Sequence, residues 1–132
     1  MRITGSAISL TVDDVPASSK FLGSHFGFTG RMAADGFAAL RHDQTGYEIV
    51  FLRTGLAVLP PALRQHRAAG VIVAFVVDDL AAEESRLRDA GVLITEPIRE
   101  EPWGERLFMV PDPNGVIYEL VEWPPQSVVG GR

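Results

Sequence analysis

Residues 12–15 are Val-Asp-Asp-Val, and residues 77–80 are Val-Asp-Asp-Leu. Each tetrad follows an apolar stretch and opens a helix-like run, over residues 16–26 in the first copy and 81–90 in the second. Asp14 is placed to cap the first of these helices. A stretch that recurs in the same surroundings indicates an internal repeat. The two tetrads therefore predict that the chain consists of two copies of one module.

The rest of each copy is typical of strands and tight turns. Strand-like segments lie near residues 7–12, 29–33, 37–42 and 47–52 in the first copy, and near 70–77, 92–98, 106–110 and 116–121 in the second. The last two strands of each copy are joined by a turn closed by glycine, Asp43-Gln44-Thr45-Gly46 or Asp112-Pro113-Asn114-Gly115. This order predicts an α+β fold of two tandem βαβββ modules that form a curved mixed sheet around a cavity.

The predicted boundaries follow from the breaks in this pattern. Module one covers residues 3–53 and module two covers residues 69–123, in a single domain. Residues 54–68, which contain two adjacent prolines, are the predicted linker, and residues 124–132 are a predicted tail.

Composition excludes several classes of function. The 132 residues include no cysteine, which excludes thiol chemistry and thiolate metal sites and is compatible with a reducing cytoplasm. A net charge of −5 without any run of Lys or Arg argues against nucleic-acid binding. The sequence has no signal-peptide pattern and no apolar run near the roughly twenty residues of a spanning helix. We therefore expect a cytoplasmic protein that binds neither nucleic acid nor membrane.

One stretch of module two resembles a known superfamily. The run Pro102-Trp103-Gly104-Glu105-Arg106-Leu107-Phe108, followed by the Asp112–Gly115 turn and then Glu119, is similar to the corresponding run of bleomycin-resistance proteins. Together with the doubled module over residues 3–123, it resembles the vicinal oxygen chelate superfamily. That superfamily includes glyoxalase I, extradiol dioxygenases, fosfomycin-modifying enzymes and bleomycin-resistance proteins. The resemblance implies the fold, but not the activity, because the fold serves both catalysts and pure binders.

The resemblance also allows a test for a metal site. In the metal-dependent relatives, His, Gln or Glu side chains from the first and last strands of each module hold the cation. Those positions correspond here to Ala7, Val50, Ile72 and Glu119, and only Glu119 can coordinate. Residues 3–12 and 70–77 contain no His, Gln, Glu or Asp, and the three histidines lie in places typical of surface residues. One carboxylate cannot hold a divalent cation against water, so we expect no metal and no cofactor.

Alternation along the strands predicts which side chains face the cavity. The predicted cavity face carries Ala7, Ser9, Thr11, Glu48, Val50 and Leu52, then Ile72, Ala74, Val76, Ile117, Glu119 and Val121, with Phe37, Ala39 and Arg41 matched by Arg106, Phe108 and Val110. The predicted helix-facing set is Leu10, Leu40, Ile49, Phe75, Met109 and Leu120. Small side chains, aromatic rings and a few polar groups are typical of a small-molecule pocket.

The predicted ligand-binding residues are Trp103, Arg106, Phe108, Glu119, Phe37, Arg41 and Glu48, the first four along one wall. Two alternatives stay open. Arg41 and Arg106 neutralise Glu48 and Glu119 in a closed polar network, or they face a ligand. Trp103 either caps the core or stacks on the ligand.

Two classes of function fit this cavity. The first is a protein that binds and sequesters a small aromatic or amphipathic molecule without turnover, as bleomycin-resistance-like members do. The alternative is an enzyme of the superfamily, a lyase, isomerase or dioxygenase, with an unusual or metal-free site that uses Glu119. Members of the superfamily often build their cavities from two chains, and a duplicated open sheet leaves edges to cover, so we expect a homodimer.

Overall fold

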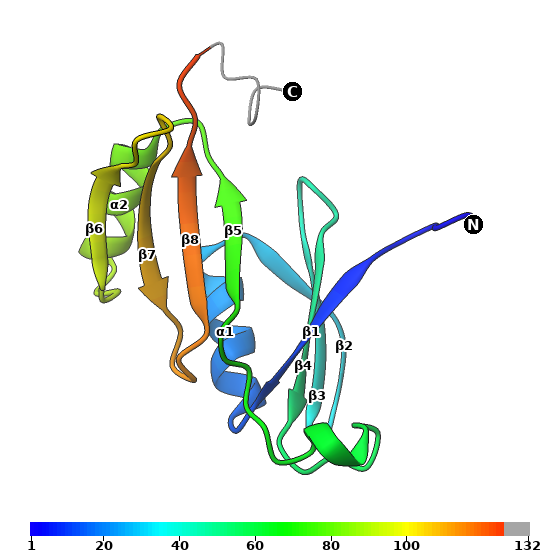
Figure 1. Cartoon of the computed structure of the whole chain (residues 1–132). Helices are drawn as coiled ribbons and strands as arrows, with labels where there is room; N and C mark the ends of the chain where they lie inside the picture. The colour runs from blue at the N-terminus through cyan, green and yellow to red at the C-terminus, as the bar shows by residue number, and fades with distance from the viewer. Residues whose placement is uncertain (126–132) are drawn as a thin grey trace. The chain divides into compact units, whose positions relative to one another are not determined.

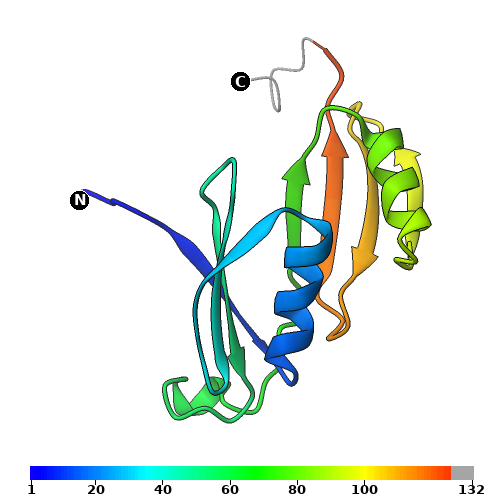
Figure 2. The same cartoon turned by 180° about the vertical axis from the view of Figure 1, so that it is seen from behind.

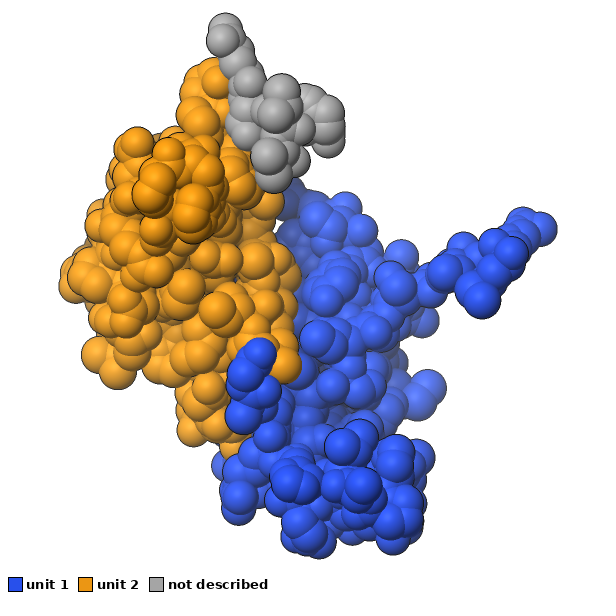
Figure 3. Space-filling view, in the orientation of Figure 1, with its two compact units in different colours: residues 1–70 blue, residues 71–132 orange. Residues whose placement is uncertain are grey.

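The computed structural model describes residues 1–125 of the chain (Figure 1). The chain divides into two compact units, residues 1–70 and residues 71–132 (Figure 3). Most of the predicted tail lies outside the described residues. Whether the two units form the predicted single domain stays a prediction.

Unit 1 is one βαβββ module. Its elements are β1 (Ala7–Val12), α1 (Val15–His25), β2 (Phe28–Ala34), β3 (Phe37–His42) and β4 (Glu48–Arg53), followed by a short 3₁₀ helix, η1 (Pro61–Leu63), in the predicted linker. The strands form a sheet in the order β1-β4-β3-β2, in which β1 and β4 are parallel and the other pairs antiparallel. Helix α1 lies on one face of this sheet and contacts β2, β3 and β4 (Figure 2).

Unit 2 repeats the same path. It consists of β5 (Ile72–Val76), α2 (Leu80–Asp89), β6 (Glu96–Glu100), β7 (Arg106–Pro111) and β8 (Ile117–Glu122), with strand order β5-β8-β7-β6. Helix α2 contacts β7 and β8. The predicted α+β fold with two βαβββ modules is confirmed, and the strands form two four-stranded sheets. No helix within residues 1–125 has the length and apolar character needed to cross a membrane.

The repeated tetrads begin the helices as predicted. The Asp14 side chain accepts a hydrogen bond of 3.1 Å from the backbone N–H of Ala17, and Asp79 accepts one of 3.1 Å from Ala82. These bonds satisfy N–H groups that the first turn of a helix leaves without a backbone partner. The second aspartate of each tetrad therefore fixes where its helix starts.

One strand lies later in the chain than predicted. Val92 and Ile94 belong to an apolar stretch that resembles a strand, but it is the connection after α2. The strand itself is Glu96–Glu100, which is charged and largely exposed at the edge of its sheet. Charged side chains are common on edge strands because they discourage pairing with other chains. Hydrophobicity alone therefore placed this strand too early.

Each sheet has a helix face and a second face turned away from its own helix, which we call the distal face. In unit 1, Leu40 pairs with Ile49 and Leu10 with Phe51 on the buried helix face, as predicted for three of these residues. The predicted cavity-facing residues of unit 1 lie on its distal face: Phe37, Ala39, Arg41, Glu48, Val50, Leu52, Ala7, Ser9 and Thr11.

In unit 2, the prediction for β7 is wrong. Phe108 pairs with Leu120 on the helix face and is fully buried, and Arg106 pairs with Glu122 on the same face. The residue opposite Glu119 on the distal face is Met109, which was predicted to face the helix. Arg106 and Phe108 therefore do not share a wall with Glu119.

The error comes from the length of one turn. Residues 42–47 separate the last β3–β4 pair, Arg41 with Glu48, whereas only residues 112–116 separate the equivalent pair, Pro111 with Ile117. The turn of unit 1 is thus one residue longer. When the two units are aligned by matching Asp43 with Asp112, the residues of β3 are matched with residues of β7 that are one position away from their true equivalents. A shift of one position exchanges the two faces of a strand.

Candidate functional site

The distal face of unit 2 places one carboxylate among apolar side chains. Glu119 on β8 has Ala74 of β5 and Met109 of β7 as its cross-strand neighbours. On the same face of β5, Ile72 is 54% exposed and Val76 is 65% exposed. Exposed apolar side chains around a polar group are a common composition for a small-molecule site.

Burial and neighbouring charges alter the acidity of Glu119. Burial raises the pKa of its carboxyl above the ordinary value, and repulsion from Glu105 and Glu101 raises the pKa further, against the opposing charge of Arg99. The Arg99 guanidinium donates hydrogen bonds of 2.6 Å to Glu101 and 2.8 Å to Glu96. No hydrogen bond or ion pair to Glu119 occurs among residues 1–125. This carboxylate is therefore free to accept a hydrogen bond from a ligand.

Trp103 lies on the loop before β7 and is 65% exposed. Its indole Nε1–H donates a hydrogen bond of 2.8 Å to Glu105. A ring with this exposure does not cap the core, so that alternative is wrong. The bond to Glu105 restricts the indole and leaves its faces available for stacking. Trp103 is thus bonded to a carboxylate whose charge also raises the pKa of Glu119.

The distal face of unit 1 brings together three of the predicted residues. Phe37 pairs with Leu52, and Arg41 lies opposite Glu48. Glu48 forms its ion pair of 2.9 Å with Arg31 rather than with Arg41. Arg31 lies where the β2–β3 register shifts, so alternation could not have assigned its direction. The predicted neutralisation of Glu48 therefore involves a residue that the sequence did not single out.

Arg41 borders a polar pocket of about 460 Å³ around the β3–β4 turn. Within it, His42 Nδ1 accepts hydrogen bonds of 3.3 Å and 3.2 Å from the backbone N–H groups of Gln44 and Thr45. This ring nitrogen is engaged in holding the turn, so it is not available as a metal ligand.

In unit 2, the predicted pairing of Arg106 with Glu119 is replaced by another one. Arg106 Nη1 lies 3.5 Å from Glu122 Oε2 on the helix face, and the other carboxylate oxygen of Glu122 accepts a 2.8 Å hydrogen bond from the backbone N–H of Leu80. Glu122 therefore ties β8 to both β7 and the start of α2. Its position beside a helix start was not evident from the sequence.

The residues present do not fit the cation that metal-dependent relatives hold. On the distal faces, Val50 has Ser9 as its neighbour on β1, and Glu119 has Ala74 as its neighbour on β5. Apart from Glu119, none of these side chains supplies a carboxylate or imidazole donor. Within the described part of the chain, no group of three or more His, Cys, Asp or Glu side chains is arranged to hold a metal ion.

Comparisons with known proteins agree with this architecture. One solved structure, a glyoxalase/bleomycin resistance protein/dioxygenase from Nocardioides, has a TM-score of 0.78 at 22% identity, covering 96% of this chain and 87% of the other. A structure from the mobile metagenome of V. Pseudocholerae has a TM-score of 0.72 at 26% identity, covering 94% and 98%. A lactoylglutathione lyase from Agrobacterium tumefaciens has a TM-score of 0.71 at 18% identity, covering 92% and 96%.

At these identities, the likeness concerns the fold and not the activity. The search of curated proteins gave no match. A family model, the Glyoxalase/Bleomycin resistance protein/Dioxygenase superfamily, matches residues 6–120. The chain therefore belongs to the glyoxalase/bleomycin resistance protein/dioxygenase superfamily.

Proposed function

We propose that the protein binds a small aromatic or amphipathic molecule on the distal face of unit 2, without a metal and without turning it over. The observation that carries the proposal is Glu119, a carboxylate with no partner among the described residues and with apolar cross-strand neighbours. Trp103 supplies an exposed ring, and Met109 supplies a polarisable side chain opposite Glu119. Of the residues predicted from the sequence, Glu119 and Trp103 remain in this proposed site.

The electrostatics favour a ligand with N–H or O–H donors over an anion. Glu101 and Glu105 add negative charge near Glu119, as the raised pKa of Glu119 reflects. An anionic ligand would be repelled by all three carboxylates. A donor on the ligand would instead satisfy Glu119, and its ring would stack on Trp103 for about 1 kcal/mol beyond the buried area.

The second candidate is a metal-free enzyme of the superfamily that uses Glu119 as a general base. The raised pKa of Glu119 favours this candidate, because a base works best when its pKa is close to the working pH. Binding alone remains the better-supported function, because the two cross-strand neighbours of Glu119, Ala74 and Met109, carry no acid, base or nucleophile. Recovery of the bound compound unchanged after prolonged incubation distinguishes binding from turnover.

The test is a fluorescence titration with aromatic compounds that differ only in carrying an amino, a hydroxyl or a carboxyl group. We expect compounds with donors to quench Trp103 fluorescence and to bind Trp103→Ala about fivefold more weakly, which corresponds to the stacking contribution. Glu119→Gln should abolish the preference for donors. Glu48→Gln, the same change on the distal face of unit 1, is the matched control and should bind like the wild type.

Equal affinity of the wild type and Trp103→Ala would overturn the assignment of the indole. Elemental analysis of protein purified without a metal-binding tag tests whether the protein carries a divalent metal. One equivalent of a divalent metal per chain that disappears in Glu119→Ala would overturn metal-free binding.

We also propose that the protein acts in the cytoplasm as a homodimer. Each sheet has two edge strands, β1 and β2 in unit 1 and β5 and β6 in unit 2. A partner chain would cover the exposed edges of these strands. Light scattering at micromolar concentration is expected to give the mass of two chains. A single-chain mass would contradict the proposal.

A further inference from the structure

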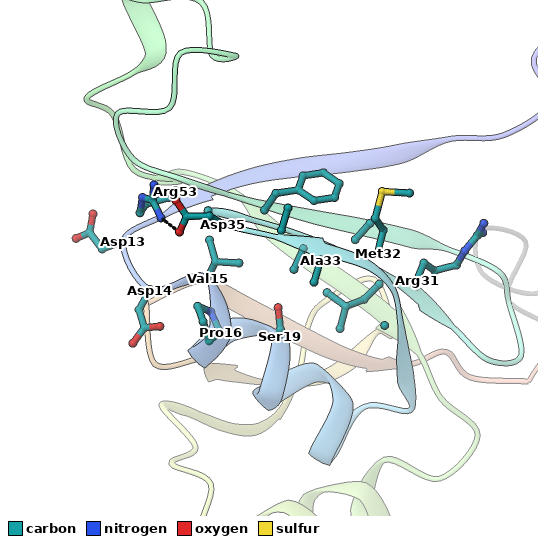
Figure 4. Close-up of a pocket in the computed structure, with 17 residues that line it drawn as sticks. Asp13, Asp14, Val15, Pro16, Ser19, Arg31, Met32, Ala33, Asp35 and Arg53 are labelled. Atoms are coloured by element: carbon teal, nitrogen blue, oxygen red, sulfur yellow. Dashed lines mark hydrogen bonds and ion pairs between the residues drawn. The ribbon is translucent and has the colours of Figure 1, made fainter.

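Unit 1 contains a cavity of about 980 Å³ between the N-terminal half of α1 and the strands β2 and β3 (Figure 4). Val15, Pro16 and Ser19 line it from the helix, and Ala33 and Ala38 line it from the sheet. Its volume lies at the upper end of the range of small-molecule pockets. All of its lining residues belong to unit 1, so it is distinct from the site proposed above on unit 2.

The cavity exists because the sheet presents small side chains to the helix. Ala33 pairs with Ala38 on the helix face, and Gly30 pairs with Leu40 one step further along. In unit 2, the residue equivalent to Ala38 is Phe108, because Ala38 pairs with Phe51 as Phe108 pairs with Leu120. Phe108 is fully buried. Protein interiors are normally packed without voids of this size, and the alanine leaves more space at this position than the phenylalanine of unit 2 does.

A hydroxyl group without a partner points into this space. Ser19 Oγ is buried and has no hydrogen-bond partner. In Figure 4 it points from α1 towards the strands. A buried hydroxyl without a partner is unfavourable, and such groups in native structures call for an explanation. A ligand with one hydrogen-bonding group would remove this cost.

The charges at the mouth of the cavity are already partnered. Arg53 donates hydrogen bonds of 2.9 Å and 3.2 Å to Asp35, and these bonds, then the charge of Arg53, lower the pKa of the Asp35 carboxyl. Asp13 accepts hydrogen bonds from Thr54 and Arg67, which lower the pKa of its carboxyl in that order. Two further mouth residues, Asp14 and Arg31, are held by the helix cap and by Glu48. Both arginines that line the cavity, Arg31 and Arg53, are therefore paired with carboxylates, so neither is left to neutralise an anionic ligand.

We propose that this cavity is a second binding site, which takes a neutral apolar molecule with a single hydrogen-bonding group such as a hydroxyl or carbonyl. The apolar part lies against the alanines of β2 and β3, and the polar group bonds to Ser19 Oγ. The proposal is independent of the function proposed for the distal face of unit 2.

The test is NMR of the backbone amides during titration with 1-octanol, sodium octanoate and octylammonium chloride, which share one chain and differ in charge. We expect 1-octanol to shift the amide signals of Ser19, Ala33 and Ala38. The two charged compounds should bind at least about tenfold more weakly, because moving a charged group from water into an apolar cavity is costly. Equal binding of octanol and octanoate, or no shift of these amides at the solubility limit of octanol, would overturn the proposal.

Two variants separate the parts of the proposal. Ala38→Phe copies the residue of unit 2 and should weaken octanol binding by occupying the space next to Ala33. Ser19→Ala keeps the cavity and should weaken octanol binding about fivefold to tenfold through the lost hydrogen bond. Ser18→Ala, the neighbouring and fully buried serine, is the matched control and should bind octanol like the wild type.

Wild-type affinity in Ser19→Ala would overturn the role of the hydroxyl, even if Ala38→Phe does not fold. Glu119→Gln should leave octanol binding unchanged. This variant therefore distinguishes failure of the second site from failure of the function proposed for unit 2.

Discussion

The hairpins β3–β4 and β7–β8 occupy the same place in the two units, but different side chains hold them. In unit 1, the ring of His42 accepts backbone hydrogen bonds at the surface of the turn. In unit 2, Asp112 is only 5% exposed and accepts hydrogen bonds from the backbone N–H groups of Asn114 and Val116 and from the Tyr118 hydroxyl. The two hairpins thus follow the same backbone path but are held by different interactions. The turn of unit 2 is held by a buried carboxylate, and the turn of unit 1 by an imidazole at the surface.

The largest expected difference between the units comes from removing these two turn residues. Asp112→Ala leaves two backbone N–H groups and the Tyr118 hydroxyl without an acceptor, and we expect a loss of about 3 kcal/mol in the free energy of unfolding. His42→Ala is the matched change in unit 1 and should cost about 1 kcal/mol. Urea unfolding with unchanged m-values measures both. Equal losses of unfolding free energy in the two variants would show that the burial of Asp112 does not increase its contribution to stability.

The equivalent positions at the ends of β4 and β8 provide a second comparison. Glu122 accepts a hydrogen bond from the first N–H of α2 and pairs with Arg106, whereas the partner of Arg53 among residues 1–125 is Asp35, whose side chain is 90% exposed. We expect Glu122→Ala to cost about 1–2 kcal/mol and Arg53→Ala clearly less, because solvent screens an exposed ion pair. Thermal unfolding should therefore show a clearly lower Tm for the first variant alone. The reverse order would mean that the contact of Glu122 with α2 does not hold in solution.

Alkaline pH should weaken unit 2 through Tyr118. Burial, and then the negative charge of Asp112, raise the pKa of the Tyr118 hydroxyl above its ordinary value. Above about pH 10, the unfolded chain loses this proton while the folded chain keeps it, so stability falls by about 1.4 kcal/mol per pH unit. Below that pH the contribution is fully present. Tyr118→Phe should cost about 1 kcal/mol at neutral pH and lack this alkaline slope. If the free energy of unfolding fell equally steeply with pH in the wild type and in Tyr118→Phe, the predicted role of Tyr118 would be wrong.

The smallest expected effect concerns the carboxylates of the two distal faces. Because the folded pKa of Glu119 is raised, stability is lost as the pH rises from the ordinary glutamate value through the folded value. Glu119→Gln should therefore stabilise the protein at pH 7 by a few tenths of a kcal/mol, since solvent screens much of the effect. Glu48→Gln should instead cost up to about 0.5 kcal/mol, because Glu48 pairs with Arg31. Unfolding curves of both variants at neutral and acidic pH show whether each change raises or lowers the free energy of unfolding.

Much of the fold followed from local signals in the sequence. The helix cap predicted at Asp14, like the one found at Asp79, depends only on neighbouring backbone groups, and alternation along β1, β3 and β4 gave the correct faces. Because every second side chain of a strand points the same way, Glu119 was also placed on the correct face of β8. These features need no knowledge of distant contacts.

The predicted site was less complete, because it depended on contacts between strands. The faces of Arg106 and Phe108 were inferred through the repeat, and one additional residue in a turn reversed them. The partners of Glu48 and Arg106 lie on other strands, at Arg31 and Glu122, and only the register brings them together. The exposure of Trp103 depends on the path of its loop, and the alternation of side chains along strands cannot predict the path of a loop.

The longer turn of unit 1 has a consequence for how a duplicated protein can change in length. On both sides of that turn the strands stay paired residue for residue, so the added residue alters only the tip of the hairpin. Deletions or insertions at residues 43–45 should leave every side chain of the sheet on its present face. The tip is therefore a suitable place to graft a peptide epitope or a label, and a poor place from which to count when the two halves of a related sequence are aligned.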